Sequence, residues 1–417
     1  MSRRLLPFMF LLYIANYLDR VNVSFAALGM NEDLGLSSTA YGFGAGVFFV
    51  GYVLFQIPAN LILVRVGARR WIGGIMLAWG VVAGALSLVR TPMEFYVLRV
   101  LLGFAEAGFF PGMILYLTLW FPAGERAKAV SRFMTAIPIA GILGGPLAGA
   151  LLSMDGWAGI AGWRWLFFLE ALPSLVLGAV TLRYLSDRPA EAHWLARDER
   201  EWLAGELRRE HEKVAERFDG SALKTLANGT VWAIATLWLL TILPGYGVAL
   251  WLPQLIREHS TRSDLVVGLL SALPPIAGCV ALILVGWHSD RTGERFLHLA
   301  IPLAVGAAGI ATLAFSQSLP QTLFGLVFAS IGISGCYGPF WSLPGRFLRG
   351  AGSASAIGLI NAVGNLGGFA GPFALGAIKD RTQSFKIALL GMAALMGLAA
   401  LLAWLLKRAP LLADHDA

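Results

Sequence analysis

Residues 7–28 read PFMFLLYIANYLDRVNVSFAAL, an apolar run long enough to cross a membrane as a helix, interrupted by the adjacent charges Asp19 and Arg20. Runs of this kind recur along the chain, because hydrophobic residues make up 57% of its 417 positions. Charged residues make up only 14%, against about 25% in soluble domains. Together with a mean hydropathy of +0.69, this composition predicts an integral membrane protein.

Twelve apolar segments near 20 residues long are expected to cross the membrane as helices. None shows the two-residue alternation of barrel strands. We expect the first to be retained, because it is long, carries charges and lacks the small-residue cleavage site of a signal peptide. The segments are residues 7–28, 41–64, 71–89, 93–119, 132–152, 165–185, 230–254, 265–286, 296–316, 319–341, 355–378 and 384–406.

The distribution of Lys and Arg predicts the orientation of these helices. Of 32 such residues, 23 fall on the side of the termini and the central polar stretch, 7 fall in the opposite loops, and Arg20 and Arg99 lie within spans. The positive-inside rule therefore places both termini and the central stretch in the cytoplasm. The net charge of +7 reflects this topology and not nucleic-acid binding.

The longest polar stretch divides the chain into two halves. We expect a six-helix bundle over residues 1–185, a cytoplasmic loop over 186–229, a second six-helix bundle over 230–406 and a cytoplasmic tail over 407–417. Within the loop, residues 189–210 carry Trp and Leu at roughly helical spacing among charges, which indicates an amphipathic helix on the membrane surface.

The two halves are related by an internal repeat at an offset of 226 residues. Arg65, Gly67 and Arg69 match Arg291, Gly293 and Arg295, and the Gly-rich run that contains Gly141 and Pro146 matches the one that contains Gly367 and Pro372. Six helices return the chain to the same side, so the repeats run parallel. This arrangement is typical of transporters whose halves move about a site at mid-membrane.

Four ionisable residues of the first half mark a candidate site: Asp19, Arg20, Arg99 and Glu106. Each costs about 2.5–3.5 kcal/mol at mid-membrane, so a function or a partner must offset them. Arginine suits carboxylate recognition, whereas a carboxylic acid in a low dielectric can carry a proton. We therefore expect Arg20 and Arg99 to bind an anion and Asp19 and Glu106 to handle protons, although a static ion-pair network between helices is an alternative.

The segment GWHSDRTGER at residues 286–295 resembles the signature loop of the major facilitator superfamily. This resemblance implies an all-α fold of 12 transmembrane helices in two six-helix bundles. It also implies a gating role on the cytoplasmic side for Asp290, Arg291, Gly293 and Arg295.

A narrower resemblance covers nearly the whole chain. The motifs NYLDRVN at 16–22, the run 96–108 with Arg99 and Glu106, WFP at 120–122 and WLP at 251–253 are similar to those of the anion:cation symporter family, closest to its tartrate-type bacterial members. The resemblance implies proton-coupled import of organic anions such as tartrate, phthalate and sugar acids across the bacterial inner membrane. It also implies that Tyr17, Tyr52, Trp341 and Asn361 complete the substrate pocket.

The working hypothesis is proton-driven symport of a small organic carboxylate by alternating access. Sodium in place of protons is compatible with the same residue types, and a monomer is expected. The run Gly-x-x-x-Gly-Pro-x-x-Gly at 141–149 resembles a motif of drug-proton antiporters, which leaves export of amphipathic compounds as an alternative. We expect no enzymatic activity, no cofactor and no metal, since His288 and His298 lie outside any metal-like cluster.

Overall fold

The computed structural model describes the chain apart from residues 193, 216–227, 348–350 and 409–417. In this described part the regular structure is helical. The first half contains α1 (Ser2–Val21), α2 (Val23–Asp33), α3 (Ser38–Val66), α4 (Ala68–Ala85), α5 (Pro92–Glu106), α6 (Phe109–Trp120), α7 (Ala123–Met134), α8 (Ala136–Leu152) and α9 (Gly162–Tyr184), with single 3-10 turns at Leu86–Leu88 and Trp157–Gly159.

A connecting segment follows, with a 3-10 turn at Pro189–Glu191 and helix α10 (Arg197–Ala215). The second half contains α12 (Gly229–Glu258), α13 (Asp264–Leu270), α14 (Leu273–Thr292), α15 (Leu297–Ala314), α16 (Leu319–Gly335), α17 (Tyr337–Phe347), α18 (Ala351–Thr382) and α19 (Lys386–Arg408).

Local sequence signals explain several helix boundaries. The Ser37 hydroxyl caps α3 by accepting a hydrogen bond from the Ala40 amide, and Thr91 caps α5 ahead of Pro92. Gly293 ends α14 at a φ of 72°, in the left-handed region that glycine adopts without steric cost. Several predicted spans consist of two consecutive helices, such as α1 with α2, which meet at Asn22.

The internal repeat extends to the level of single helices. Shifted by the 226 positions that separate Gly141 from Gly367, α3 covers residues 264–292, which are the joint bounds of α13 and α14. The same shift carries α7 and α8 onto α18. The two halves are thus parallel repeats of six spans, as the sequence predicted.

By length and apolar composition, ten segments of the described chain can cross a membrane. The other two of the twelve spans are α1 with α2, and α18. Four charges lower the hydropathy of α1, and α18 is rich in glycine with two asparagines.

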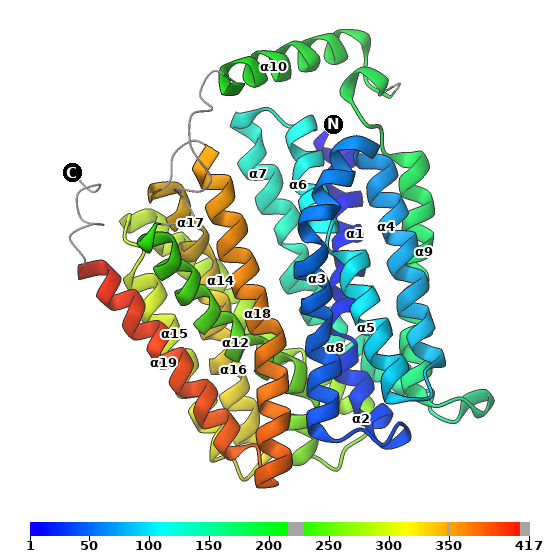
Figure 1. The fold of residues 1–417 in the computed structure, drawn as a ribbon, viewed down its shortest axis with the longest axis vertical. Coiled ribbons are helices and arrows are strands. Elements are labelled where there is room, and N and C mark those ends of the chain that lie inside the picture. Colours follow the sequence, from blue (N-terminus) through cyan, green and yellow to red (C-terminus); the bar gives the residue numbers. More distant parts are fainter. Residues whose placement is uncertain (193, 216–227, 348–350, 409–417) are drawn as a thin grey trace.

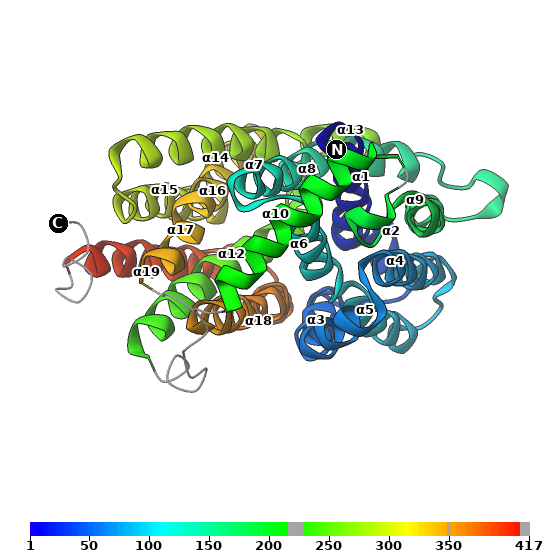
Figure 2. The same ribbon diagram turned by 90° about the horizontal axis from the view of Figure 1, so that it is seen from above.

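The spans form two bundles that stand side by side (Figure 1). The chain begins and α19 ends toward the same end of the molecule, which we call the terminal end; the opposite end is the far end. Helix α10 lies across the terminal end, over the boundary between the bundles (Figure 2). Leu203 and Leu207 of α10 are buried, while Trp202 is 65% exposed, so Trp202 does not belong to the buried face of this helix.

The bundles meet closely at the far end. A Cβ atom added to Gly145 of α8 would lie 2.4 Å from the Gly268 carbonyl oxygen of α13, so only glycine fits this crossing. On the other side, a Cβ atom at Gly376 of α18 would lie 2.1 Å from the Ser38 carbonyl oxygen. The Tyr41 hydroxyl donates to the Leu250 carbonyl across the same boundary, at 2.6 Å. The far end is therefore closed in this structure.

One carboxylate reinforces this closure from the end of α18. Asp380, beyond the apolar part of the helix, accepts hydrogen bonds from the amides of Ser38 (3.0 Å) and Thr39 (2.7 Å) at the start of α3. Partial burial acts to raise the pKa of Asp380, but the hydrogen bonds from Thr39, Ser37 and Ser38 outweigh it and lower the pKa to about 2. A carboxyl with a depressed pKa stabilises the contact fully above about pH 4, and the contribution is lost as the pH falls toward 2.

Replacing Asp380 with alanine is expected to shift the molecule toward separation at the far end. Loss of a helix N-cap costs about 1 kcal/mol, or roughly a fivefold change in the equilibrium between the two arrangements. Spin labels at Met93 and Phe315, exposed residues of the two bundles, would report the distance by pulsed electron paramagnetic resonance.

Asp155→Ala is the matched control for Asp380→Ala. Asp155 accepts a hydrogen bond from the Gly162 amide at the start of α9 (2.7 Å), within one bundle. This variant should leave the label distance distribution unchanged. An equal response of the two variants would contradict a specific role of Asp380 between the bundles.

Candidate functional site

The first bundle holds a buried ion pair between α1 and α5. Arg20 Nη2 and Nε lie 3.0 and 3.2 Å from Glu106 Oε2, and the Asn16 amide donates to the same oxygen at 2.9 Å. Glu106 is fully buried and the Arg20 side chain is 13% exposed. The second oxygen, Glu106 Oε1, has no hydrogen-bond partner among the described residues. The carboxylate is thus held on one oxygen and bare on the other.

Asp19 lies on a different face of α1 from Arg20, as expected for neighbouring helical residues. Its Oδ2 atom accepts hydrogen bonds from the Trp79 indole of α4 (3.1 Å) and the Ser174 hydroxyl of α9. The side chain is fully buried. The structure therefore separates the two predicted carboxyls, one beside an arginine and one beside neutral donors.

Arg99 is fully buried between α5 and α3. Its Nε and Nη2 atoms donate to the carbonyl oxygens of Gly44 (3.2 Å) and Ala45 (3.0 Å), while Nη1 has no hydrogen-bond partner among the described residues. The guanidinium carbons of Arg20 and Arg99 lie 5.4 and 5.0 Å from the ring centroid of Phe48. The two guanidinium carbons are therefore separated by no more than the sum of 5.4 and 5.0 Å.

Tyrosines from both bundles surround Arg20. The guanidinium lies 5.1 Å from the ring centroid of Tyr52, and Tyr17 and Tyr246 are close enough to interact with it electrostatically. Tyr246 belongs to α12 of the second bundle and packs against Phe49 of α3, with ring centroids 4.5 Å apart. The ion pair therefore lies next to the boundary between the bundles. Tyr246 occupies the repeat position of Arg20, and sequence reasoning had not placed it in the site.

The two other predicted pocket residues belong to the second bundle. Trp341 of α17 is 37% exposed and packs edge-on against Trp238, with centroids 5.2 Å apart. Asn361 of α18 is partly buried. Both stay predictions as pocket residues.

The predicted gating loop is ordered by contacts within itself. Arg295 pairs with Asp290 at 2.5 Å and donates to the Ser289 hydroxyl at 2.9 Å. Arg291 lies over the Trp287 ring at 5.6 Å. Among the described residues, the structure shows no ion pair from this loop to the first bundle, and the gating role of the loop stays a prediction.

Sequence reasoning missed a fifth buried ionisable residue, Glu170 of α9. It lies inside the predicted span 165–185 and is only 5% exposed. Its Oε2 atom has no hydrogen-bond partner among the described residues. The signal was present in the sequence, since a carboxyl inside an apolar span is as unusual there as at Glu106.

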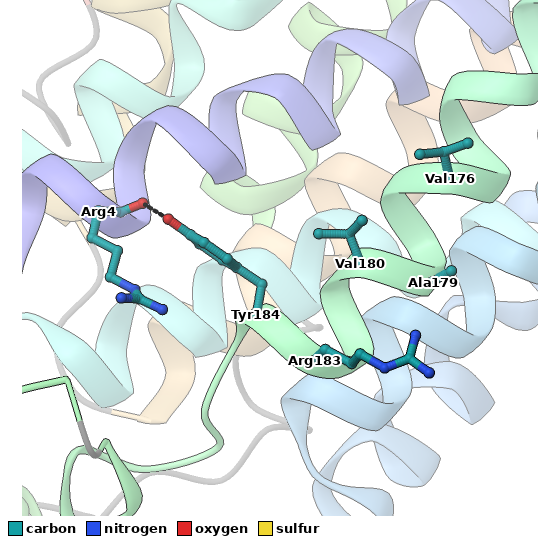
Figure 3. A pocket seen from close by; sticks show the side chains of 6 residues that line it. All are labelled: Arg4, Val176, Ala179, Val180, Arg183 and Tyr184. Carbon is teal, nitrogen blue, oxygen red and sulfur yellow. Dashed lines mark hydrogen bonds between the residues drawn. The ribbon is translucent and has the colours of Figure 1, made fainter.

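A surface hollow of about 470 Å³ lies elsewhere, near the terminal end (Figure 3). It is lined by Val176, Ala179, Val180, Arg183 and Tyr184 of α9 and by Arg4 of α1. Arg4 and Arg20 are 16 residues apart on α1, about 24 Å along the helix axis. None of the predicted site residues lines this hollow, and the chemistry of the chain is concentrated around Arg20 and Glu106.

Comparisons with known proteins agree with this architecture. The profile of the Major Facilitator Superfamily matches residues 9–372. A protein of Agrobacterium vitis that is named as a tartrate transporter is 47% identical over 405 residues, which cover 97% of this chain and 93% of the relative. A quinolone resistance transporter of Acinetobacter baumannii is 40% identical over 386 residues, 93% of this chain and 89% of the relative.

Among solved structures, a bacterial homologue of the human lysosomal transporter Spinster, crystallised in an inward-facing conformation, superimposes with a TM-score of 0.80. The alignment covers 97% of this chain and 96% of that one, at 16% identity, and so bears on the fold alone. Profile, relatives and fold agree with the two parallel six-span bundles. The chain belongs to the Major Facilitator Superfamily, a superfamily of membrane transporters and not of enzymes.

Proposed function

We propose that the protein imports a small organic anion, a carboxylate such as tartrate, together with protons. The observation that carries this proposal is the ion pair of Arg20 with Glu106 beside the boundary between the bundles. An arginine that already holds one carboxylate is matched in shape and charge to a second one. The substrate would therefore compete with Glu106 for the same guanidinium.

This competition couples the anion to a proton. While Glu106 is ionised, it occupies Arg20 and neutralises the charge of that guanidinium. Protonation of Glu106, with its bare Oε1 atom as the natural position, weakens the pair and frees Arg20 for the incoming carboxylate. The net charge around Arg20 is then the same before and after one carboxylate binds, which keeps the cost of burying this part of the site low.

Arg99 provides the second positive charge. Two of its nitrogens are fixed by backbone carbonyls, and Nη1 remains available. Because Arg20 and Arg99 both lie against the ring of Phe48, a short dicarboxylate could interact with both. Tyr17 and Tyr52, with Trp341 and Asn361 from the other bundle, would contribute hydroxyl, amide and aromatic contacts to the remainder of the substrate.

The closed far end corresponds to one state of alternating access. We place the terminal end in the cytoplasm of a bacterial cell, in the inner membrane, following the charge distribution of the loops. In this orientation the structure is closed toward the periplasm. Transport requires the contacts at Gly145, Gly376 and Asp380 to separate while the terminal end closes, with Asp290 and Arg295 then free to find new partners.

Proteoliposomes provide the direct test. Radiolabelled tartrate should accumulate under an imposed inward proton gradient, and an uncoupler should abolish the accumulation. Phthalate, sugar acids and other small carboxylates should compete in an order that defines the substrate class. A sodium gradient at constant pH tests the alternative cation. No uptake of tartrate and no competition by any carboxylate, in folded protein, would reject the proposal.

Export is the second candidate, favoured by the similarity to a quinolone resistance transporter and by the Gly-Pro run at 141–149. An exporter would lower the accumulation of a quinolone in cells that express the protein. The two functions are separated by Arg20→Gln, because quinolone efflux through an apolar cavity would survive this change and carboxylate import would not.

Glu106→Gln is expected to lower gradient-driven accumulation by about tenfold under a pH step of one unit, because each coupled proton supports tenfold accumulation per unit. Exchange of internal for external substrate should persist, since exchange needs no net proton movement. Glu94→Gln, on the same helix but in the exposed first turn, is the matched control. Unchanged accumulation in Glu106→Gln would remove Glu106 from the coupling role.

A further inference from the structure

At the interface of α1 with α9, the carboxyl groups of Asp19 and Glu170 lie about one helical turn apart. Ser174 of α9 donates its hydroxyl to Asp19 of α1. Glu170 precedes Ser174 by four residues, so it lies on the same face of α9, about one turn away. Asn22 follows Asp19 at the end of α1 and lies beside Glu170. Because the two helices run antiparallel, Asp19 lies opposite Ser174 and Asn22 lies opposite Glu170.

Both carboxyls are withdrawn from water. Asp19 is fully buried and Glu170 is 5% exposed. One oxygen of each, Asp19 Oδ1 and Glu170 Oε2, has no hydrogen-bond partner among the described residues, and neither amide atom of Asn22 has one. These unpartnered atoms contrast with Asp19 Oδ2, which accepts from two donors.

The charges around the two carboxyls are negative. Glu170 faces Asp19, and Asp19 also faces Glu106. None of the ion pairs found among the described residues includes Asp19 or Glu170. Arg20, the neighbour of Asp19 in the sequence, forms its ion pair with Glu106. Of the other elements that pack against α9, α4 carries its arginines at the terminal end, α8 carries no charge, and Asp33 of α2 binds Trp163 nearer the far end.

Two buried carboxyls without a cation cannot both be ionised, because an unpaired buried charge costs several kcal/mol and like charges add to it. We infer that Asp19 and Glu170 together form a second proton-binding site, separate from the Arg20 and Glu106 pair, and that transport moves two protons with each divalent anion. The inference rests on the proposed function. Glu170 is the residue that this site adds.

Charge balance gives the second proton a physical role. A dicarboxylate carries two negative charges, and a membrane potential that is negative inside opposes the entry of each of them. Two protons make the transported set neutral, so the potential no longer opposes import. Asp19 is adjacent to Arg20 on α1, so a shift of α1 when Arg20 exchanges Glu106 for substrate also moves Asp19 against Ser174 and Glu170. The two sites are thereby linked through one helix.

The test is the dependence of steady-state tartrate accumulation on the imposed pH step, in proteoliposomes with the potential clamped at zero by potassium and valinomycin. Each coupled proton contributes about tenfold accumulation per pH unit. The unmodified protein should therefore show a slope of two decades per unit, and Glu170→Gln a slope of one. Glu170→Asp, which keeps a carboxyl, should restore a slope of two with a shifted pH profile.

Asp33→Asn is the matched control, because Asp33 of α2 also binds α9, through the Trp163 indole at 2.6 Å, without belonging to the site. Its slope should equal that of the unmodified protein. A slope of two in Glu170→Gln, or of one in the unmodified protein, would overturn the inference and leave the proposed function standing. Absence of any accumulation in the unmodified protein would instead reject the proposed function. If Glu170→Gln does not fold, an unshifted pH profile in Glu170→Asp overturns the inference.

Discussion

Arg20→Gln is expected to abolish detectable carboxylate binding and to lower the stability of the protein. Truncating one partner of a buried, hydrogen-bonded charge pair costs about 2–5 kcal/mol, so the dissociation constant for tartrate should rise by at least about 30-fold. Stability falls for a different reason, because Glu106 is left buried beside Asn16 without its cation. Titration calorimetry and thermal unfolding in detergent measure the two effects separately.

The double variant Arg20→Gln with Glu106→Gln separates binding from folding. Removing both charges leaves no unpaired ion, so the double variant should recover most of the thermal stability that the single variant loses. It should not recover anion binding, because the guanidinium is still absent. Arg65→Gln, an exposed arginine at the end of α3, is the control. Titration heats of Arg20→Gln equal to those of the unmodified protein would exclude Arg20 from the substrate site.

Gly145→Val is expected to abolish transport while the protein stays folded. The Cβ atom would lie 2.4 Å from the Gly268 carbonyl oxygen, and neither backbone can move aside within its own helix. The closed arrangement of the far end is then sterically excluded. The arrangement with the far end open removes the clash, because α8 and α13 belong to different bundles. The variant should therefore be held open at the far end, with turnover reduced below detection.

Gly397→Val is the matched control, since a Cβ atom at this position of α19 meets nothing within 4 Å. Uptake by this variant should be close to that of the unmodified protein. The label pair at Met93 and Phe315 should show a longer distance in Gly145→Val and an unchanged one in Gly397→Val. Active transport by Gly145→Val would mean that the crossing at Gly268 opens and closes without the close approach seen here.

Much of the fold was predictable because membrane spans are encoded by composition and length. The offset of 226 residues between Gly141 and Gly367 identified the repeat, and it holds for helix bounds as well. The interruptions were not predictable from hydropathy. α1 ends at Val21 and α2 begins at Val23 within one apolar run, and α5 and α6 are similarly divided near Gly108. These breaks depend on packing, as where Trp71 covers Gly108 and donates to its carbonyl oxygen.

The candidate site was predictable in part. Arg20 and Glu106 were identified as charged residues within apolar spans, and in the structure they form an ion pair. The environment of Arg99 could not be predicted, because its hydrogen bonds go to backbone carbonyls, which carry no sequence signal. The gating role of Asp290 stays a prediction, and in this conformation Asp290 pairs with Arg295 of the same loop. Glu170 could be missed because no basic residue adjoins it in the sequence to mark it as half of a charged pair.

The hydrogen bonds between the bundles have a consequence for sequence divergence. Asp380 binds the amides of Ser38 and Thr39, and Tyr41 binds the carbonyl of Leu250, so each bond joins a side chain of one bundle to the main chain of the other. A main-chain group is present whatever residue occupies the position. These main-chain hydrogen bonds can therefore persist when the residue on the main-chain side changes, whereas Arg20 and Glu106 must change together or not at all. Because Leu250 is buried, related proteins should keep an apolar residue there without needing one particular side chain, while they retain the Arg20 and Glu106 pair as a unit.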